Sequence, residues 1–340
     1  MKLSVAVGLA FLSTVASAAV EAPPPKMDYH VVPLVSDQPG MAQNTDPNLV
    51  NPWGISQAPG NPLWVSDNGT NVSTLYDPNS GAINPLVVSI PPGAPTGTVF
   101  VPPGTGFPVS ENGVKDDSLF LFDTESGAIL GWSDKVDTNK AIVAVDNSAK
   151  GSAYKGLAID PADGLVFAAD FANNQVQVYD NRWHRVGAFT DKSLPKHFAP
   201  FNVVWLSNRL YVAFAKRARG SIDEVDGKGL GYVDVFDAHG DLQAHLIANG
   251  DLNAPWGMTV APTNFGQFSG ALLVGNFGDG KVHAYDFKTG NFLGTLKTSG
   301  DKTLVIDGLW SLFPGPDKES VMFSAGPDGE THGLLGQIHH

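Results

Sequence analysis

Carboxylate and amide side chains recur along this 340-residue chain, at the predicted ends of short apolar strands and at the predicted starts of others. Ca²⁺ and other divalent ions bind six to eight oxygen ligands of this kind. If the strands lie side by side, such side chains from different strands could hold one ion. The sequence therefore makes a divalent-metal site the first chemical hypothesis. Its candidate ligands are Asp67, Asp170, Asn202, Asn276 and Asp307.

The same residue types also have a structural use. Asp and Asn side chains accept hydrogen bonds from the backbone of the turn that follows a strand. Each candidate ligand could therefore hold a turn instead of a metal, and both alternatives stay open.

Two residues are candidate acid–base catalysts. His332 lies in the segment Asp328-Gly329-Glu330-Thr331-His332-Gly333, and a histidine beside carboxylates can act as a base near neutral pH. Glu125 follows another predicted strand. Beside an ion that activates water, they would make a metal-assisted hydrolase or lactonase-type enzyme. The sequence contains no Gly-x-Ser-x-Gly, His-Glu-x-x-His or phosphate-loop motif, which argues against serine hydrolases, zincins and nucleotide enzymes.

A second set of residues suits binding without catalysis. Trp53 and Trp256 recur in the related segments 51–54 and 254–257. With Asn68 they could form a surface for a sugar or phenolic ring, although tryptophans at such positions also pack between structural units. The charged loop 215–231 could cover that surface as a lid, or it could simply be solvated.

Two overlapping N-glycosylation sequons are present, Asn68-Gly69-Thr70 and Asn71-Val72-Ser73. Because they overlap, we expect one glycan at most, on Asn71 rather than Asn68.

The elements that must position these residues form a repeat. An alternating strand that ends in an aromatic residue and an aspartate occurs four times, at Asp77, Asp180, Asp237 and Asp286, with a turn after each. The spacing is about 50 residues, or twice that, which is typical of a β-propeller. Six units also share a loose x-Gly-apolar pattern. It lies at Gly54, Gly97, Gly156, Gly257 and Gly308, with Asn202 in the fourth unit.

The last unit lacks an outer strand, and residues 29–35 have the composition to supply it. We therefore predict an all-β, six-bladed β-propeller whose ring is closed by an N-terminal strand that completes the last blade. In such a ring the inner-strand starts and the loops between second and third strands share one face. The candidate residues would meet there, at the mouth of the central channel.

The domain organisation predicted from the sequence is simple. Residues 1–18 have the positive start, apolar stretch and small-residue cleavage site of a secretion signal peptide. Residues 19–28 form a Pro-rich lead-in, and residues 29–340 form a single propeller domain. We expect a secreted, extracellular protein.

Composition limits the partners and the chemistry. The net charge of −13 argues against nucleic acid and anionic membranes as partners. Because the chain has no cysteine, it has neither thiol catalysis nor thiolate metal sites. We expect a monomer whose partner is a small molecule or a glycan.

The chain resembles a little-characterised family of secreted β-propeller proteins of bacteria and fungi, some of which carry a PEP-CTERM sorting tail. The matching segments are 34–37, 46–54, 64–70, 95–97, 155–158, 229–237, 254–257, 275–280 and 332–334. More distantly, it is similar to NHL-repeat and gluconolactonase-like six-bladed propellers. The latter hold a divalent metal in the channel through Glu, Asn and Asp, a pattern that this sequence does not match residue by residue.

The resemblance implies a fold but no activity. The sequence favours a secreted propeller that binds a small molecule or glycan at the channel mouth. The alternative is a metal-assisted hydrolase that uses the polar ring in the channel.

Overall fold

The computed structural model describes Met1 and residues 28–340. The predicted signal peptide and nearly all of the Pro-rich lead-in lie outside the described residues.

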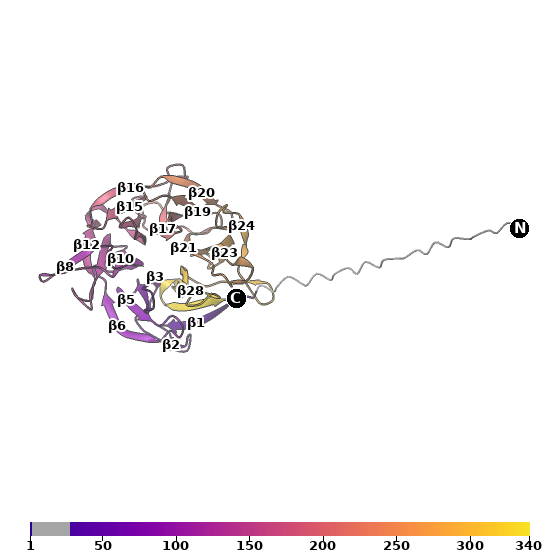
Figure 1. The fold of residues 1–340 in the computed structure, drawn as a ribbon, viewed down its shortest axis with the longest axis horizontal. Helices are drawn as coiled ribbons and strands as arrows, with labels where there is room; N and C mark the ends of the chain where they lie inside the picture. Colours follow the sequence, from indigo (N-terminus) through magenta and orange to yellow (C-terminus); the bar gives the residue numbers. More distant parts are fainter. Residues whose placement is uncertain (2–27) are drawn as a thin grey trace.

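Six antiparallel blades surround a central channel, and in each blade the strand nearest the channel pairs with the next strand of that blade (Figure 1). Blade one contains β3 (Pro52–Gln57), β4 (Leu63–Asp67), β5 (Val72–Tyr76) and β6 (Ile83–Ser89). Blade two contains β7 (Pro95–Phe100), β10 (Phe120–Thr124), β11 (Ala128–Trp132) and β12 (Ile142–Asp146). Blade three contains β13 (Tyr154–Asp160), β14 (Leu165–Asp170), β15 (Gln175–Asp180) and β16 (Arg185–Phe189).

The second half of the ring follows the same order. Blade four contains β17 (Phe198–Leu206), β18 (Arg209–Lys216), β19 (Gly231–Phe236) and β20 (Leu242–Ala248). Blade five contains β21 (Pro255–Val260), β22 (Leu272–Asn276), β23 (Val282–Tyr285) and β24 (Phe292–Thr295). Blade six contains β27 (Leu309–Pro314), β28 (Ser320–Ala325) and β29 (Leu334–His339).

The ring closes as predicted from the sequence. Strand β1 (His30–Ser36) pairs antiparallel with β29, so the first described strand completes the blade formed by the end of the chain. The short β2 (Asn44–Thr45) extends this sheet. The all-β, six-bladed prediction is confirmed.

The remaining elements lie outside the sheets of the six blades. The hairpin of β8 (Pro108–Glu111) and β9 (Val114–Asp117) projects outward from blade two (Figure 1). A second hairpin joins β25 (Lys297–Thr298) to β26 (Lys302–Thr303). The helical turns are η1 (Ser148–Lys150), η2 (Gly266–Phe268) and α1 (Pro327–Glu330). No helix in residues 28–340 has the length and apolarity needed to cross a bilayer.

The repeated aspartates hold turns. Asp77 Oδ1 accepts hydrogen bonds from the backbone N–H groups of Asn79 and Ser80, and Asp286 Oδ1 does the same for Lys288 and Thr289. These bonds satisfy the tight turn between the third and fourth strands of a blade. The aromatic–Asp repeat therefore specifies blade architecture.

The inner glycines let neighbouring blades approach at the channel. A Cβ atom on Gly54 would lie 2.6 Å from the Thr96 carbonyl of blade two, and one on Gly257 would lie 2.5 Å from the Trp310 carbonyl of blade six. In blade four, Asn202 replaces glycine, and its Nδ2 donates to the Trp256 carbonyl of blade five over 2.8 Å. The x-Gly-apolar pattern thus sets the width of the ring.

Candidate functional site

A buried lysine lies at the start of an inner strand, on the face of the ring where second strands end. Lys155 of β13 has a side chain that is only 3% exposed, and its Nζ lies 2.5 Å from Glu125 Oε1. The same Nζ lies 5.0 Å above the ring of Trp53. A charged ammonium is tolerated at this depth because a carboxylate and an aromatic face compensate for its lost hydration.

Hydrogen bonds connect this ion pair to residues from two other blades. Asn68 Nδ2 donates to Glu125 Oε2 over 3.0 Å, and Asn51 Nδ2 donates to Asn68 Oδ1 over 3.4 Å. Asn51 Nδ2 also donates to Glu330 Oε2 over 2.7 Å. Glu330 belongs to α1, in the loop between the second and third strands of blade six.

Blade four adds a further carboxylate through its long loop. A backbone bridge between Arg217 and Glu224 folds the loop back on itself, and the Arg217 guanidinium donates to the Phe171 carbonyl of blade three over 3.0 Å. Glu224 is thereby held near Lys155 and Glu330. We call these six residues the mouth cluster. Its members are Asn51, Asn68, Glu125, Lys155, Glu224 and Glu330.

The mouth cluster has more acid than its single lysine can neutralise. Burial raises the pKa of the Glu224 carboxyl to about 7, and although Lys155 opposes this rise, Glu330 and Asp226 add to it. Burial also raises the pKa of Glu330, against the hydrogen bond from Asn51 and the charge of Lys155. The cluster would therefore bind an additional positive charge favourably.

Tryptophans form the floor of the mouth cluster. The ring centroids of Trp53 and Trp310 lie 3.4 Å apart, and Trp256 meets both rings edge-on at 5.9 Å. Trp310 Nε1 donates to Asn51 Oδ1, and Trp256 Nε1 donates to the Lys155 carbonyl. Trp53 and Trp256 are 1% and 3% exposed, so the structure packs them beneath the mouth. Their part in ligand binding stays a prediction.

The channel continues beyond this floor as a second space. A cavity of about 300 Å³ is lined by the inner strands of all six blades, at segments 54–57, 97–100, 157–159, 202–206, 256–259 and 311–314. These are the later parts of the inner strands, so the cavity lies toward the face opposite the mouth cluster.

Each of the five predicted metal ligands is engaged separately. Asp67 accepts from Thr74, Asp170 accepts from Ser152 and Gln177, Asn202 donates to Trp256, Asn276 donates to Asp251, and Asp307 accepts from the backbone of Asp328. No hydrogen bond of the described residues joins any two of the five. The structure thus places them as supports of turns and blade contacts, and their joint metal role stays a prediction.

The two predicted catalysts have different side-chain partners, although the His332 carbonyl accepts from the backbone N–H of Asn51 in the mouth cluster over 3.0 Å. Glu125 is part of the mouth cluster, whereas His332 Nδ1 pairs with Asp37 Oδ2 over 2.8 Å. Asp37 Oδ1 also accepts from the Gly333 N–H. Among the described residues, no hydrogen bond or ion pair connects His332 with Glu125. Their catalytic roles remain predictions.

The two sequon asparagines differ in their surroundings. The Asn68 amide nitrogen, to which a glycan would attach, already donates to Glu125. Asn71 is exposed at the turn into β5. This difference supports Asn71 as the acceptor, which stays a prediction.

Sequence reasoning did not select Lys155, Glu224 or Glu330 as site residues. Lys155 precedes the inner glycine of blade three, where the other units carry uncharged residues or, at Asp307, an acid. A basic residue at that channel position was the signal that could have identified it. Glu330 lies two residues before His332, in the segment already singled out.

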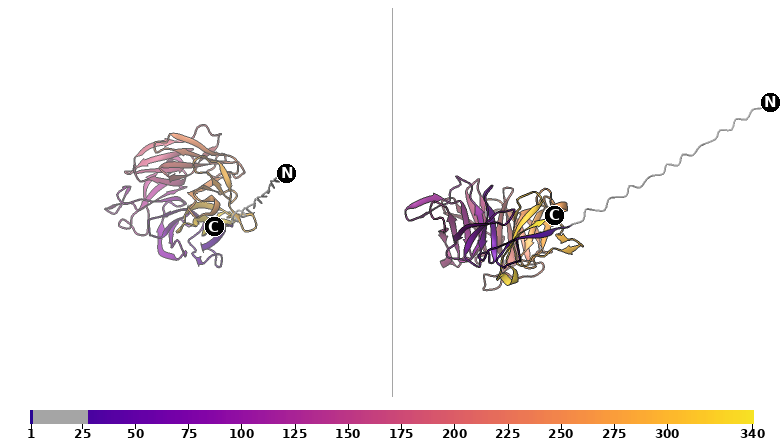
Figure 2. Two further views of the ribbon diagram at one scale, coloured as in Figure 1. Left: turned by 45° about the vertical axis from the view of Figure 1, so that its right-hand side comes forward. Right: turned by 90° about the horizontal axis from the view of Figure 1, so that it is seen from below.

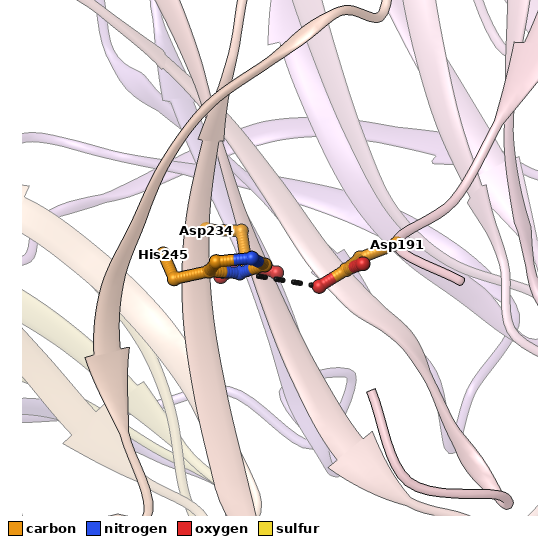
Figure 3. Close-up of side chains that lie close together, drawn as sticks. All are labelled: Asp191, Asp234 and His245. Carbon is orange, nitrogen blue, oxygen red and sulfur yellow. Dashed lines mark hydrogen bonds and ion pairs between the residues drawn. The ribbon is translucent and has the colours of Figure 1, made fainter. Parts of the chain in front are cut away.

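A different set of metal-ligating atoms lies at the junction of blades three and four. Asp191, Asp234 and His245 bring one ligand atom each within 4.8 Å of one another (Figure 3). This is the one such group within residues 28–340. A metal is therefore feasible at a place that the sequence did not indicate.

No family model matches the chain. It is 33% identical over 319 residues to uncharacterized protein L690 of Acanthamoeba polyphaga mimivirus, covering 90% of this chain and 84% of the relative. It is 30% identical over 319 residues to uncharacterized protein R648 of the same virus, covering 90% of this chain and 78% of that protein.

A solved structure shares the fold. Hydrazine synthase of Kuenenia stuttgartiensis superposes with a TM-score of 0.51 and 16% sequence identity, over 84% of this chain and 76% of that one. At this identity the similarity concerns architecture alone.

Proposed function

We propose that this chain, which belongs to the family of the uncharacterised mimivirus proteins L690 and R648, binds a small cationic molecule that bears hydroxyl groups. The ligand would lie on the mouth cluster. An amino sugar has the matching chemistry, because it combines an ammonium group with several hydroxyls.

The excess of carboxylates over the single ammonium is the observation that carries this proposal. Glu125 contacts Lys155, the charges of Glu224 and Glu330 act on Lys155 and on each other, and burial raises the pKa values of Glu224 and Glu330. A ligand ammonium near Glu224 and Glu330 would favour their ionised forms and gain charge-assisted hydrogen bonds.

The uncharged members of the mouth cluster would recognise hydroxyls. Half-buried Asn68 donates one amide N–H to Glu125 and has a second N–H to offer a hydroxyl, whereas buried Asn51 holds Asn68 and Glu330 in place. Half-buried Phe277 stacks on Trp310 with ring centroids 4.0 Å apart and extends the aromatic surface. Such a face could contact the apolar side of a sugar ring.

Calorimetric titrations at pH 7, where most of the glucosamine amine is protonated, with glucosamine, glucose and N-acetylglucosamine test the proposal. Glucosamine should bind measurably more tightly than the two uncharged sugars, and Glu330→Gln should weaken it by about tenfold, the equivalent of one charge-assisted hydrogen bond. Glu111→Gln is the matched control, because Glu111 pairs with Lys140 over 2.7 Å on the peripheral β8–β9 hairpin.

Equal affinity for glucosamine and glucose would contradict the cationic part of the proposal. Unchanged glucosamine affinity in Glu330→Gln would contradict the placement of the ligand on the mouth cluster.

A metal-assisted hydrolase is the second candidate. Asp67 Oδ1 is buried without a hydrogen-bond partner, which favours a cation such as Ca²⁺ near this carboxylate. Stoichiometric Ca²⁺ in the purified protein, together with lactone hydrolysis that Asp67→Asn abolishes, would establish it. Purified protein that contains no Ca²⁺ and hydrolyses no lactone would contradict this second candidate function.

We also propose that the protein acts outside the cell as a glycosylated monomer. The signal-like residues 1–18 and the Asn71 sequon support this. Sequencing of the mature N-terminus, expected near Ala19, tests secretion. A mass shift on deglycosylation that Asn71→Gln removes tests the glycan, and sedimentation tests the monomer.

A further inference from the structure

We propose that Asp191, Asp234 and His245 bind a divalent transition-metal ion, with Zn²⁺ as its representative, between blades three and four. Asp234 lies on β19 of blade four, and His245 lies opposite it on β20. Asp191 follows β16 of blade three and faces the pair from the neighbouring blade (Figure 3). The ion would join two blades.

The spacing of the ligand atoms fits a small ion. His245 Nδ1 lies 3.2 Å from Asp234 Oδ1 and 3.3 Å from Asp191 Oδ2. Two ligands that bind Zn²⁺ at about 2.0–2.1 Å in tetrahedral geometry lie about 3.3 Å apart. These three atoms therefore need little movement to coordinate one ion.

The two carboxylates also lack a permanent positive partner. Asp234 is 1% exposed, and its Oδ2 is buried without a hydrogen bond. Within residues 28–340, His245 is the one ion-pair partner of either carboxylate. Two neighbouring buried carboxylates with a single histidine require either a shared proton or a bound cation. A cation between these residues would give the buried Asp234 Oδ2, which has no hydrogen-bond partner, a positive neighbour.

The surroundings suit coordination by a transition metal. The backbone N–H and the hydroxyl of Ser193 donate to Asp191 over 2.7 and 3.0 Å, and such bonds orient a ligating carboxylate. The His245 side chain is 51% exposed, which leaves an entry path and room for a water ligand. One imidazole and two carboxylates favour Zn²⁺ or a neighbouring first-row ion over Ca²⁺, which prefers six to eight oxygens.

Zn²⁺ titration of chelator-treated full-length protein, in competition with a chromogenic chelator, tests this proposal. We expect one high-affinity Zn²⁺ per chain, with affinity at least about tenfold weaker in His245→Ala and in Asp234→Asn. Co²⁺ should give a visible absorption band that these variants lose. Because His245 is half exposed, its replacement leaves the buried packing intact.

Two other His–Asp pairs provide matched controls. His184 Nδ1 lies 3.0 Å from Asp180 Oδ2, and His332 Nδ1 lies 2.8 Å from Asp37 Oδ2. Neither pair belongs to a three-ligand group. His184→Ala and His332→Ala should therefore bind Zn²⁺ like the unmodified protein.

Three results would overturn the proposal. They are the absence of stoichiometric Zn²⁺, equal affinity in folded His245→Ala, and loss of binding in either control variant. The first would mean that Asp191 and Asp234 share a proton. Melting curves with Zn²⁺ and with chelator verify that each variant is folded. Zn²⁺ should raise the melting temperature only of proteins that retain Asp191, Asp234 and His245.

Discussion

At the channel mouth and at the junction of blades three and four, carboxylates from different blades lie close together. The mouth contains Lys155, whose ammonium contacts Glu125. The junction contains only His245 beside Asp191 and Asp234. One region therefore has a permanent cation of its own, and the other has a histidine that is charged only when protonated.

This difference shows that carboxylates that lie close together do not by themselves define a binding site for a cation. At the mouth, the chain's own ammonium already occupies the centre, so an added ligand must approach the outer carboxylates Glu224 and Glu330. At the junction, no lysine or arginine of residues 28–340 pairs with Asp191 or Asp234, so in our proposal an external ion takes that place. The two regions should therefore respond in opposite ways to the same kind of substitution.

The largest effect should follow removal of the permanent cation. Lys155→Met leaves Glu125, whose side chain is 20% exposed, without its ion-pair partner, which should cost about 3 kcal/mol of unfolding free energy, the lower end of the range for a broken buried pair. Urea denaturation measures this. Lys140→Met, which removes an exposed partner of Glu111, should change stability far less. Equal losses in the two variants would show that Lys155 does not neutralise the mouth.

A carboxylate-to-amide change at the mouth should be destabilising. Glu125→Gln keeps the shape of the side chain but removes the charge that faces Lys155, so we expect a loss of about 2 kcal/mol. The measurement is again urea denaturation, at pH 8. An unchanged or higher stability would contradict the assignment of Glu125 as the main partner of Lys155.

The same carboxylate-to-amide change at the junction should instead increase the free energy of unfolding. In metal-free protein at pH 8, Asp234→Asn removes the repulsion between two buried carboxylates and offers an amide N–H to Asp191. Burial and the neighbouring Asp191 raise the pKa of Asp234, so ionising it costs stability that the amide restores, about 1 kcal/mol. Saturating Zn²⁺ should reverse the order of the two proteins. If metal-free Asp234→Asn were less stable than the unmodified protein, the expected difference between the mouth and the junction would be contradicted.

The last effect concerns the pH dependence of stability. Glu224 has an ordinary pKa of 4.5 in the unfolded chain and about 7 in the fold, so between these values the native state binds more protons. Its contribution to stability is therefore fully present below pH 4.5 and is lost as pH rises toward 7. Glu224→Gln should flatten this part of the stability profile, whereas Glu111→Gln should not. Glucosamine affinity should increase over the same range, because ionised Glu224 attracts the ammonium.

Much of the fold followed from the sequence because its signals are repeated and local. The aromatic–Asp phrase and the inner glycines each mark one blade, and a single unpaired strand at residues 29–35 matched the incomplete last blade. Figure 2 shows the resulting ring from two further directions, including edge-on. The reason for Asn202 at a glycine position was not predictable, because its hydrogen bond to Trp256 depends on how blades four and five meet.

The candidate site was predictable only in part. Glu125 and Asn68 were selected from the sequence, and the structure joins them by a hydrogen bond at the mouth. The polar strand ends Asp67 and Asp170 bond to neighbouring side chains of their own blades, because a buried carboxylate requires donors close by.

The group of Asp191, Asp234 and His245 at the junction could not be predicted from the sequence pattern. Asp234 and His245 face each other across neighbouring strands, and Asp191 comes from the preceding blade. Only the packing of blade three against blade four brings these three residues together, and no repeat or motif in the sequence encodes that packing.

A crystal structure of the protein grown with glucosamine tests the central claim most directly. The account predicts the ligand at the mouth cluster, with its ammonium within hydrogen-bonding distance of Glu224 or Glu330, while Lys155 stays on Glu125. A sugar bound in the cavity of about 300 Å³ at the opposite half of the channel, with the mouth unchanged, would contradict it.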